Sequence, residues 1–277
     1  MKAFERANIY LTGNGVVNTN LTFDDTVRDI GGRIADAEVI PLPADAVVVP
    51  GFIDIHVHGA GGYDAMDATP EALFGVAETL AKEGTTSFLA TTMSMPHDRI
   101  ETALRNVAKY RGMHSECGAR LVGVHLEGPY ISPKYAGAQA ADAIAAPDIA
   151  EFDGYYEASG QSVRIVTLAP ERNGALSFIR HLRSLGIVPS MGHTDATEED
   201  IRLAMEAGAM SVTHTYNAQR PLHHREIGTV GSAMLYDGLY TELICDLIHV
   251  SAPAVRLLHK CKPKDKLILI TDAMRAK

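Results

Sequence analysis

The chain is poor in cysteine and lacks several features that would place it outside the ordinary globular class. Its three cysteines, Cys117, Cys245 and Cys261, show no paired spacing, so the sequence predicts neither a disulfide framework nor a cysteine-based zinc site. The first ten residues, MKAFERANIY, carry charges where a signal peptide needs an apolar core. No apolar run reaches the length of a membrane span. We therefore expect reduced thiols and a cytoplasmic location.

Basic residues are fewer than acidic ones. Lys and Arg total 25 against 34 Asp and Glu, which gives a formal net charge of −9. This balance argues against a nucleic-acid partner and against binding to an anionic membrane surface. Internal repeats, low-complexity segments and long linkers are absent as well. With 277 residues, of which 46% are hydrophobic and 21% charged, the composition predicts one large globular core with a small appendage.

A hydrophobic segment that closes on His-x-His is the most informative pattern. Residues 47–59 read VVVPGFIDIHVHG. Side chains alternate between the two faces of a strand, so His56 and His58 point the same way and both imidazoles can reach one cation. The alternative is a pair of exposed histidines at a strand end.

Four further apolar segments also end in a single acid or histidine. These residues are Glu127, His193, His214 and Asp272. A (β/α)8 barrel presents polar residues at the carboxyl ends of its strands to the mouth of the active site. If they served packing alone, each buried imidazole or carboxylate would need a partner of its own.

From Val47 onward, segments of strand length alternate with helical patterns. Helical periodicity is present over Pro70–Glu83, Arg99–Tyr110 and Glu198–Ala207. Eight strands with mostly short loops favour a TIM-like barrel of the α/β class, over residues 47–277, rather than an open doubly wound sheet. Residues 1–46 contain short β segments broken by glycines and predict a small β domain. The barrel strands are expected near 47–58, 86–92, 120–127, 163–169, 187–193, 210–216, 241–249 and 266–272.

The residues at the strand ends are of the types that bind a catalytic metal ion. Glu127, His193 and His214 supply three ligands and leave a position open, and a divalent ion in such a site lowers the pKa of water from about 15.7 towards 7. A second ion can be held by His56, His58 and Asp272, with Glu127 bridging. Because the donors include no thiolate, Zn²⁺, Fe²⁺, Mn²⁺ and Co²⁺ all fit them, and the residue types do not choose among these ions. We expect one or two divalent ions and rank Zn²⁺ and Fe²⁺ before Mn²⁺ and Co²⁺.

Six motifs occur in a fixed order from about residue 50 to the end: HVHG, HLEGPYISPKYAGAQ, MGHTDA, THTYNAQRPLHHREIG, DLIHV and ITDAM. In this order they resemble the N-acetylglucosamine-6-phosphate deacetylases of the amidohydrolase superfamily. The resemblance implies hydrolysis of the N-acetyl group to give acetate and glucosamine-6-phosphate.

Two alternatives stay open. One is another hydrolase of the superfamily, acting on N-acetylgalactosamine-6-phosphate, a cyclic amide or an N-acyl amino acid. The other is a non-catalytic binding protein on the same fold.

The resemblance also implies roles for individual residues. Asp272 matches the catalytic acid/base, which takes a proton from the attacking water and returns it to the departing amine. The alternative for Asp272 is a helix N-cap, since Thr-Asp-Ala is also a capping sequence. His249 matches a histidine that contacts the sugar, and Asn217 and Ala218 would line the same pocket. A structural role for His249 stays open.

A basic loop over residues 222–228 carries His223, His224 and Arg225 without an intervening acid. A guanidinium binds phosphate oxygens through directed, charge-assisted hydrogen bonds, so Arg225 is the candidate for phosphate recognition, with His224 beside it. The resemblance implies that this arginine reaches the substrate from the neighbouring subunit of a homodimer. An exposed basic loop that contacts only water is the alternative.

Two departures from the family pattern stand out. Gln139, which the resemblance places among the substrate-binding residues, stands where one branch of the family has a histidine that polarises the substrate carbonyl, and that branch lacks the His-x-His pair. A second metal at His56 and His58 can take over this polarising function. Relatives also continue beyond the ITDAM segment with a last helix and strands that complete a β-sandwich. By this resemblance we expect a carboxyl-truncated chain whose residues 1–46 form an incomplete sandwich.

Overall fold

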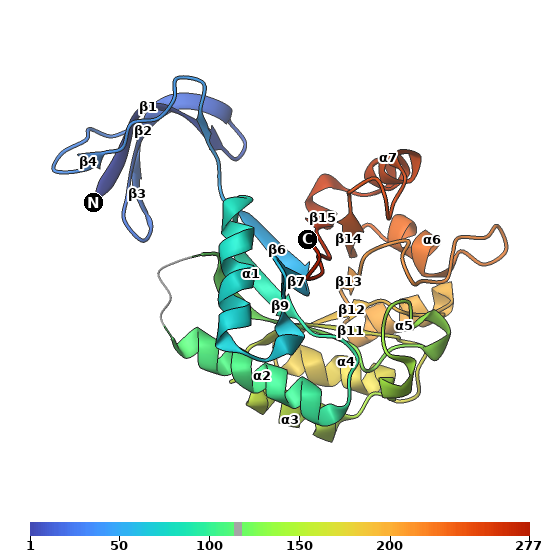
Figure 1. Cartoon of the computed structure of the whole chain (residues 1–277). Helices are drawn as coiled ribbons and strands as arrows, with labels where there is room; N and C mark the ends of the chain where they lie inside the picture. Colours follow the sequence, from blue (N-terminus) through green and yellow to red (C-terminus); the bar gives the residue numbers. More distant parts are fainter. Residues whose placement is uncertain (114–117) are drawn as a thin grey trace. The chain divides into compact units, whose positions relative to one another are not determined.

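The computed structural model describes residues 1–113 and 118–277 and separates them into two compact units, Met1–Phe52 and Ile53–Lys277 (Figure 1). Cys117 lies outside the described residues, whereas Cys245 and Cys261 are free and exposed. Among the described residues, no helix is both long and apolar enough to cross a membrane.

The first unit is a small β domain. β1 and β2 form an antiparallel hairpin, β3 pairs antiparallel with β2, and the short strands β4 and β5 pair parallel with β1. Its core consists of Ala7, Ile9 and Leu21. Ala7 and Ile9 are two positions apart on one strand, so alternation brings both to the same face. The strands span Lys2–Leu11, Gly15–Phe23, Val27–Ile30, Glu38–Val39 and Val47–Val48.

Eight parallel strands form the barrel of the second unit, in the order β15-β14-β13-β12-β11-β10-β9-β6. The seam between the first and last strands is closed by a parallel bridge between Val57 and Ala273, and the Asp272 amide donates to the His56 carbonyl at 2.9 Å. The predicted TIM-like barrel is therefore confirmed. Its strands are β6 Phe52–Val57, β9 Thr85–Thr91, β10 Arg120–Glu127, β11 Val163–Leu168, β12 Val188–Met191, β13 Ser211–Val212, β14 Tyr240–Ile244 and β15 Leu267–Ile270.

The helices lie around the outside of the strands (Figure 1). The bounds of α5 agree with the sequence prediction because Thr197 and Asp200 form a capping box at its start and Gly208, with φ of 116°, ends it. Such a cap stabilises a helix by about 1 kcal/mol. The helices are α1 Pro70–Lys82, α2 His97–Gly112, α3 Ile149–Ala158, α4 Ala175–Ser184, α5 Glu198–Ala207, α6 Gly228–Leu235 and α7 Ala252–Cys261, with a β7–β8 hairpin at Gly59–Ala60 and Tyr63–Asp64 and 3-10 turns at Ala65–Asp67, Pro133–Tyr135, Ala141–Ala143 and Lys264–Lys266.

Several barrel strands are shorter than the sequence pattern predicts. β6 begins at Phe52 rather than at residue 47, because Val47 and Val48 form β5 and pair with β1 of the small domain. The largest differences at the carboxyl ends are in β14 and β13. β14 ends at Ile244 instead of continuing to His249, because the Asp246 carboxylate accepts the amide N–H groups of Ile248 and His249 and closes a turn. β13 ends at Val212, just before residues with positive φ that cannot continue a ladder. In both cases the chain leaves the sheet early, so polar side chains project from loops at the barrel mouth.

Polar side chains fill the barrel interior next to this mouth. Asp54, His56, His125 and Glu242 are all buried, and His56 contacts Glu242 although β6 and β14 are not neighbours in the sheet. Apolar residues at intervening positions, such as Val124 in β10, belong to the core that the helices cover. Because successive side chains of a strand alternate, polar groups line the inside of the barrel and apolar groups pack against the helices outside it.

Candidate metal centre and catalytic site

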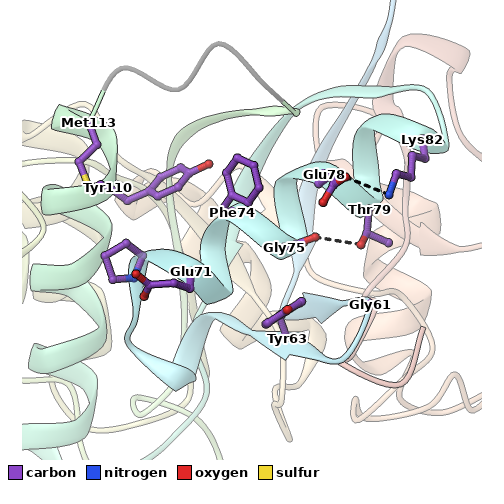
Figure 2. A pocket seen from close by; sticks show the side chains of 11 residues that line it. Gly61, Tyr63, Glu71, Phe74, Gly75, Glu78, Thr79, Lys82, Tyr110 and Met113 are labelled. Carbon is purple, nitrogen blue, oxygen red and sulfur yellow. Dashed lines mark hydrogen bonds and ion pairs between the residues drawn. The ribbon is translucent and has the colours of Figure 1, made fainter.

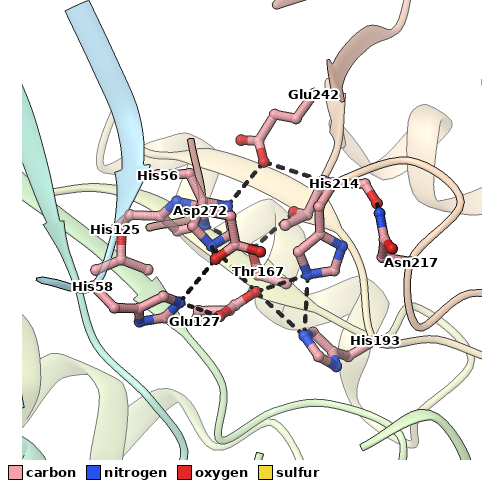
Figure 3. Close-up of polar contacts among 12 residues, drawn as sticks. His56, His58, His125, Glu127, Thr167, His193, His214, Asn217, Glu242 and Asp272 are labelled. Atoms are coloured by element: carbon pink, nitrogen blue, oxygen red, sulfur yellow. Dashed lines mark hydrogen bonds and ion pairs between the residues drawn. The ribbon is translucent and has the colours of Figure 1, made fainter. Parts of the chain in front are cut away.

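The six predicted metal ligands lie together at the carboxyl ends of the barrel strands (Figure 3). His56 and Glu127 are on β6 and β10, and the other four lie within two residues of the ends of their strands. The ligand atoms fall into two groups, and within each group they lie within 4.8 Å of one another. The first group is Glu127, His193 and His214, and the second is His56, His58 and Asp272.

Glu127 lies at the centre of both groups. Its Oε1 is 2.9 Å from His214 Nε2, 3.2 Å from His193 Nε2 and 3.4 Å from His56 Nε2. Its Oε2 is 3.1 Å from His58 Nε2. One carboxylate therefore contacts imidazoles of both groups, which is the position of a bridging ligand.

The donor set fits a divalent metal. His56 Nε2 is buried and makes no hydrogen bond, although it lies 3.4 Å from the carboxylates of Glu127 and Asp272. His193 Nε2 and His214 Nε2 are only 3.1 Å apart. Leaving polar atoms buried without partners is costly. Imidazole nitrogens and carboxylate oxygens that converge in this way are ligands of divalent metal ions.

The charges of the cluster support one another. Burial raises the pKa of Glu127, but His56, His193 and His214 outweigh it and hold this pKa well below its ordinary value. Burial lowers the pKa of His58, yet hydrogen bonds to Asp272 and Glu127 raise it to about 9. Imidazoles bind metals in their neutral form, so metal binding here has to release protons.

Three of the ligands have unusual backbone conformations. The φ angles of His193, His214 and Asp272 are 47°, 29° and 49°. Non-glycine residues rarely adopt this left-handed region, and such strain clusters at functional sites. Hydrogen bonds hold these turns in place: the Ser132 amide donates to the His193 carbonyl at 2.8 Å, and the Asp272 amide to His56.

A cavity of about 340 Å³ opens above the ligands. Four predicted substrate-binding residues line it, namely Gln139, Asn217, Ala218 and His249. His249 is exposed, and its Nδ1 lies 2.7 Å from Asp246 Oδ2, which fixes the ring at the rim. Apolar side chains complete the wall: Met93, Ile244 and Met274.

The other two predicted substrate residues do not line this cavity. His224 and Arg225 lie on the exposed loop, where Arg225 Nη1 is 3.1 Å from His224 Nε2. The structure of the single chain therefore separates the proposed phosphate contacts from the metal ligands.

Gln139 makes a contact that the sequence did not suggest. It is buried, and both ends of its amide are engaged: the Ser94 amide donates to Oε1 at 2.6 Å, and Nε2 donates to Glu127 Oε2 at 2.9 Å. Gln139 thus orients the central carboxylate as well as lining the cavity.

Three buried residues of the site were not predicted: Asp54, His125 and Glu242. Asp54 accepts the Thr271 hydroxyl at 2.5 Å across the barrel seam. The ring nitrogens of His125 lie 3.0 Å from the Ile55 carbonyl and 2.7 Å from the Thr167 hydroxyl. A sequence pattern could have indicated two of them: Asp54 and His125 each lie two positions before a predicted ligand in an apolar strand, as Asp54-x-His56 and His125-x-Glu127.

A larger cavity, of about 700 Å³, lies against α1 and α2 (Figure 2). Tyr63, Phe74 and Tyr110 are among its lining residues, and Glu78 pairs with Lys82 at its edge. The described residues that line it form none of the ligand groups, so size alone does not mark the functional site.

A sequence model of the Amidohydrolase family matches residues 47–274. The chain belongs to the amidohydrolase family. This family is metal-dependent, in agreement with the donor groups at the mouth of the barrel.

The amidohydrolase chain is 46% identical over 266 residues to N-acetylglucosamine-6-phosphate deacetylase of Bacillus subtilis (strain 168), covering 95% of this chain and 67% of that protein. It is 40% identical over 275 residues to N-acetylgalactosamine-6-phosphate deacetylase of Escherichia coli O157:H7, covering 98% and 71%.

Solved structures agree with this family membership. The N-acetylglucosamine-6-phosphate deacetylase of Thermotoga maritima matches with a TM-score of 0.87 and 32% sequence identity, covering 99% of this amidohydrolase chain and 71% of that chain. The chain spans 59% to 71% of the length of four curated deacetylases that it matches.

Proposed function

We propose that the chain catalyses the metal-dependent deacetylation of N-acetylglucosamine-6-phosphate to glucosamine-6-phosphate and acetate. The observation that carries this proposal is the pair of ligand groups that share Glu127 at the floor of a cavity, with Asp272 beside them. Relatives named as N-acetylglucosamine-6-phosphate deacetylases, at 40% to 46% identity, support the choice of substrate.

The six ligands would hold one or two divalent ions, with Zn²⁺ or Fe²⁺ preferred. Such an ion supplies Lewis acidity, which polarises a carbonyl and lowers the pKa of water. In the reaction, the oxygen of a water molecule bonds to the amide carbon and the C–N bond breaks.

Asp272 is the proposed acid/base. Burial raises its pKa, but His56 and His58 outweigh this and lower it below the ordinary value, so the carboxylate is ionised and can accept a proton. It takes a proton from the attacking water and returns it to the amine nitrogen, because an amine leaves in its protonated form. Asn217, Ala218 and His249 would orient the sugar in the cavity.

A substrate panel tests this proposal. Acetate release is measured from N-acetylglucosamine-6-phosphate, N-acetylgalactosamine-6-phosphate and unphosphorylated N-acetylglucosamine. We expect the highest kcat/KM with the first. A preference for the galacto sugar would favour the activity named for the Escherichia coli relative. No acetate from any of them would favour a different hydrolase or a binding protein.

Recognition of the phosphate is assigned to Arg225, supplied by the neighbouring subunit of a homodimer in the cytoplasm. Arg225 is exposed and lies outside the cavity of its own chain, as a residue that acts on a partner's site would. Changing Arg225 to alanine is expected to raise KM for the phosphorylated sugar and to leave kcat nearly unchanged, because it touches a part of the substrate that does not react. Equal losses on phosphorylated and unphosphorylated sugars would contradict this role.

Mixing two variants separates action across subunits from action within one. Subunits with Arg225→Ala keep Asp272, and subunits with Asp272→Asn keep Arg225. A mixed dimer should therefore contain one complete site and regain a low KM. Mixtures that behave as the sum of the two separate variants would show that Arg225 does not act across the interface.

A further inference from the structure

Glu242, a buried glutamate on β14, takes no part in the proposed chemistry. Glu242 has 0% exposure and lies next to Leu243 and Ile244, which are buried and apolar. Placing a carboxylate inside a barrel costs several kcal/mol unless its oxygens are satisfied. The contacts of Glu242 therefore indicate its function.

One oxygen of Glu242 contacts both ligand groups (Figure 3). Glu242 Oε2 lies 3.0 Å from His56 Nδ1 and accepts the His214 amide N–H at 3.2 Å, whereas Oε1 is buried without a hydrogen-bond partner. His56 belongs to the group with His58 and Asp272, and His214 to the group with Glu127 and His193. The same glutamate also accepts the Thr215 amide through its backbone carbonyl at 2.8 Å.

The contact with His56 fixes which ring nitrogen is free. A carboxylate oxygen only accepts hydrogen bonds, so Nδ1 of His56 carries the proton that faces Glu242. In the neutral form of the ring, which is the form that binds metals, Nε2 is then the nitrogen with the free lone pair, and it lies 3.4 Å from both Glu127 and Asp272. A histidine ligand is commonly oriented in this way by a carboxylate at its other nitrogen.

The contact with His214 supports a strained turn. His214 has a φ of 29°, far from the values that a histidine prefers. Two successive amides, those of His214 and Thr215, donate to the side chain and the backbone of Glu242. Such strain persists only where neighbouring groups fix the backbone.

Glu242 does not itself complete a further metal site. His56, His125 and Glu242 also have ligand atoms within 4.8 Å of one another. Both ring nitrogens of His125, however, already contact the Ile55 carbonyl and the Thr167 hydroxyl. His125 has no nitrogen left for an ion, so Glu242 acts through the ligands that it touches.

We infer that Glu242 is a positioning residue: by accepting hydrogen bonds from His56 and His214 with one oxygen, it sets both ligand groups in register for their ions. This inference rests on the proposed metal-dependent function. Positioning by Glu242 requires a side chain long enough to contact both histidines and an oxygen that accepts their hydrogen bonds.

Two substitutions separate reach from charge. Glu242→Gln keeps the length and one acceptor oxygen, whereas Glu242→Asp keeps the charge but is too short to contact both histidines. Thr241→Val is the matched control, because Thr241 is buried on the same strand and its hydroxyl has no hydrogen-bond partner. Co²⁺ is titrated into metal-free protein and followed by visible absorption, with the melting temperature of each variant measured in parallel.

We expect Glu242→Asp to weaken Co²⁺ binding by about 10- to 100-fold, the usual effect of losing a partner of a metal ligand. Glu242→Gln should stay closer to the unchanged protein than Glu242→Asp does, and Thr241→Val should match the unchanged protein. The reverse order, or equal affinities in all four proteins, would overturn the inference. An unchanged protein that binds no Co²⁺ would instead contradict the proposed metal-dependent function.

Discussion

Replacing His193 with alanine is expected to remove one metal ion and essentially all deacetylase activity. His193 is one of three ligands in the group with Glu127 and His214, and its Nε2 lies 3.2 Å from Glu127. With two ligands left, the group no longer forms the three-ligand open site that catalytic ions use. Metal content and kcat should therefore fall together.

The matched control for this change is His259→Ala. His259 is exposed on α7 and belongs to neither ligand group, so its loss should leave metal content and rate unchanged. Full turnover by the His193 variant would contradict the assignment of the ligands.

The second large effect is expected for Asp272→Asn. An asparagine has nearly the same shape and keeps an oxygen that can bind a metal, but it cannot take up a proton at neutral pH. We expect kcat to fall by about 10²-fold or more, with metal content nearly intact. The measurements are single-turnover acetate release and metal analysis of the same sample.

Asp265→Asn serves as the comparison, since Asp265 lies in a 3-10 turn at Lys264–Lys266, away from the cavity lining. If the rate of the Asp272 variant falls only in proportion to metal loss, Asp272 is a ligand and not a proton carrier. An undiminished kcat would remove it from the mechanism altogether.

Much of the fold could be predicted because the repeating patterns are local. The strand-length segments that end in His56, Glu127 and Asp272 are visible in the sequence, and in a parallel barrel all strand ends meet at one mouth. The same rule places the three remaining ligands, His58, His193 and His214, at this mouth without any knowledge of the loops.

The contacts that the sequence could not give are those between distant positions. His56 and Glu242 are 186 residues apart, and a glutamate in a short apolar strand has no local signal for its partner. Gln139 donates to Glu127 because of the path of its loop, which depends on tertiary packing and not on a periodic sequence pattern. The left-handed conformations of His193 and Asp272 likewise depend on hydrogen bonds to other strands and loops.

The central claim is that this chain hydrolyses an amide with a metal held by the strand-end ligands. Acetate release from N-acetylglucosamine-6-phosphate, measured while Zn²⁺ or Fe²⁺ is added back to chelator-treated protein, tests it most directly. We predict no turnover without metal and a rate that rises to a plateau at one or two equivalents per chain. Normal turnover by the metal-free protein would contradict the account.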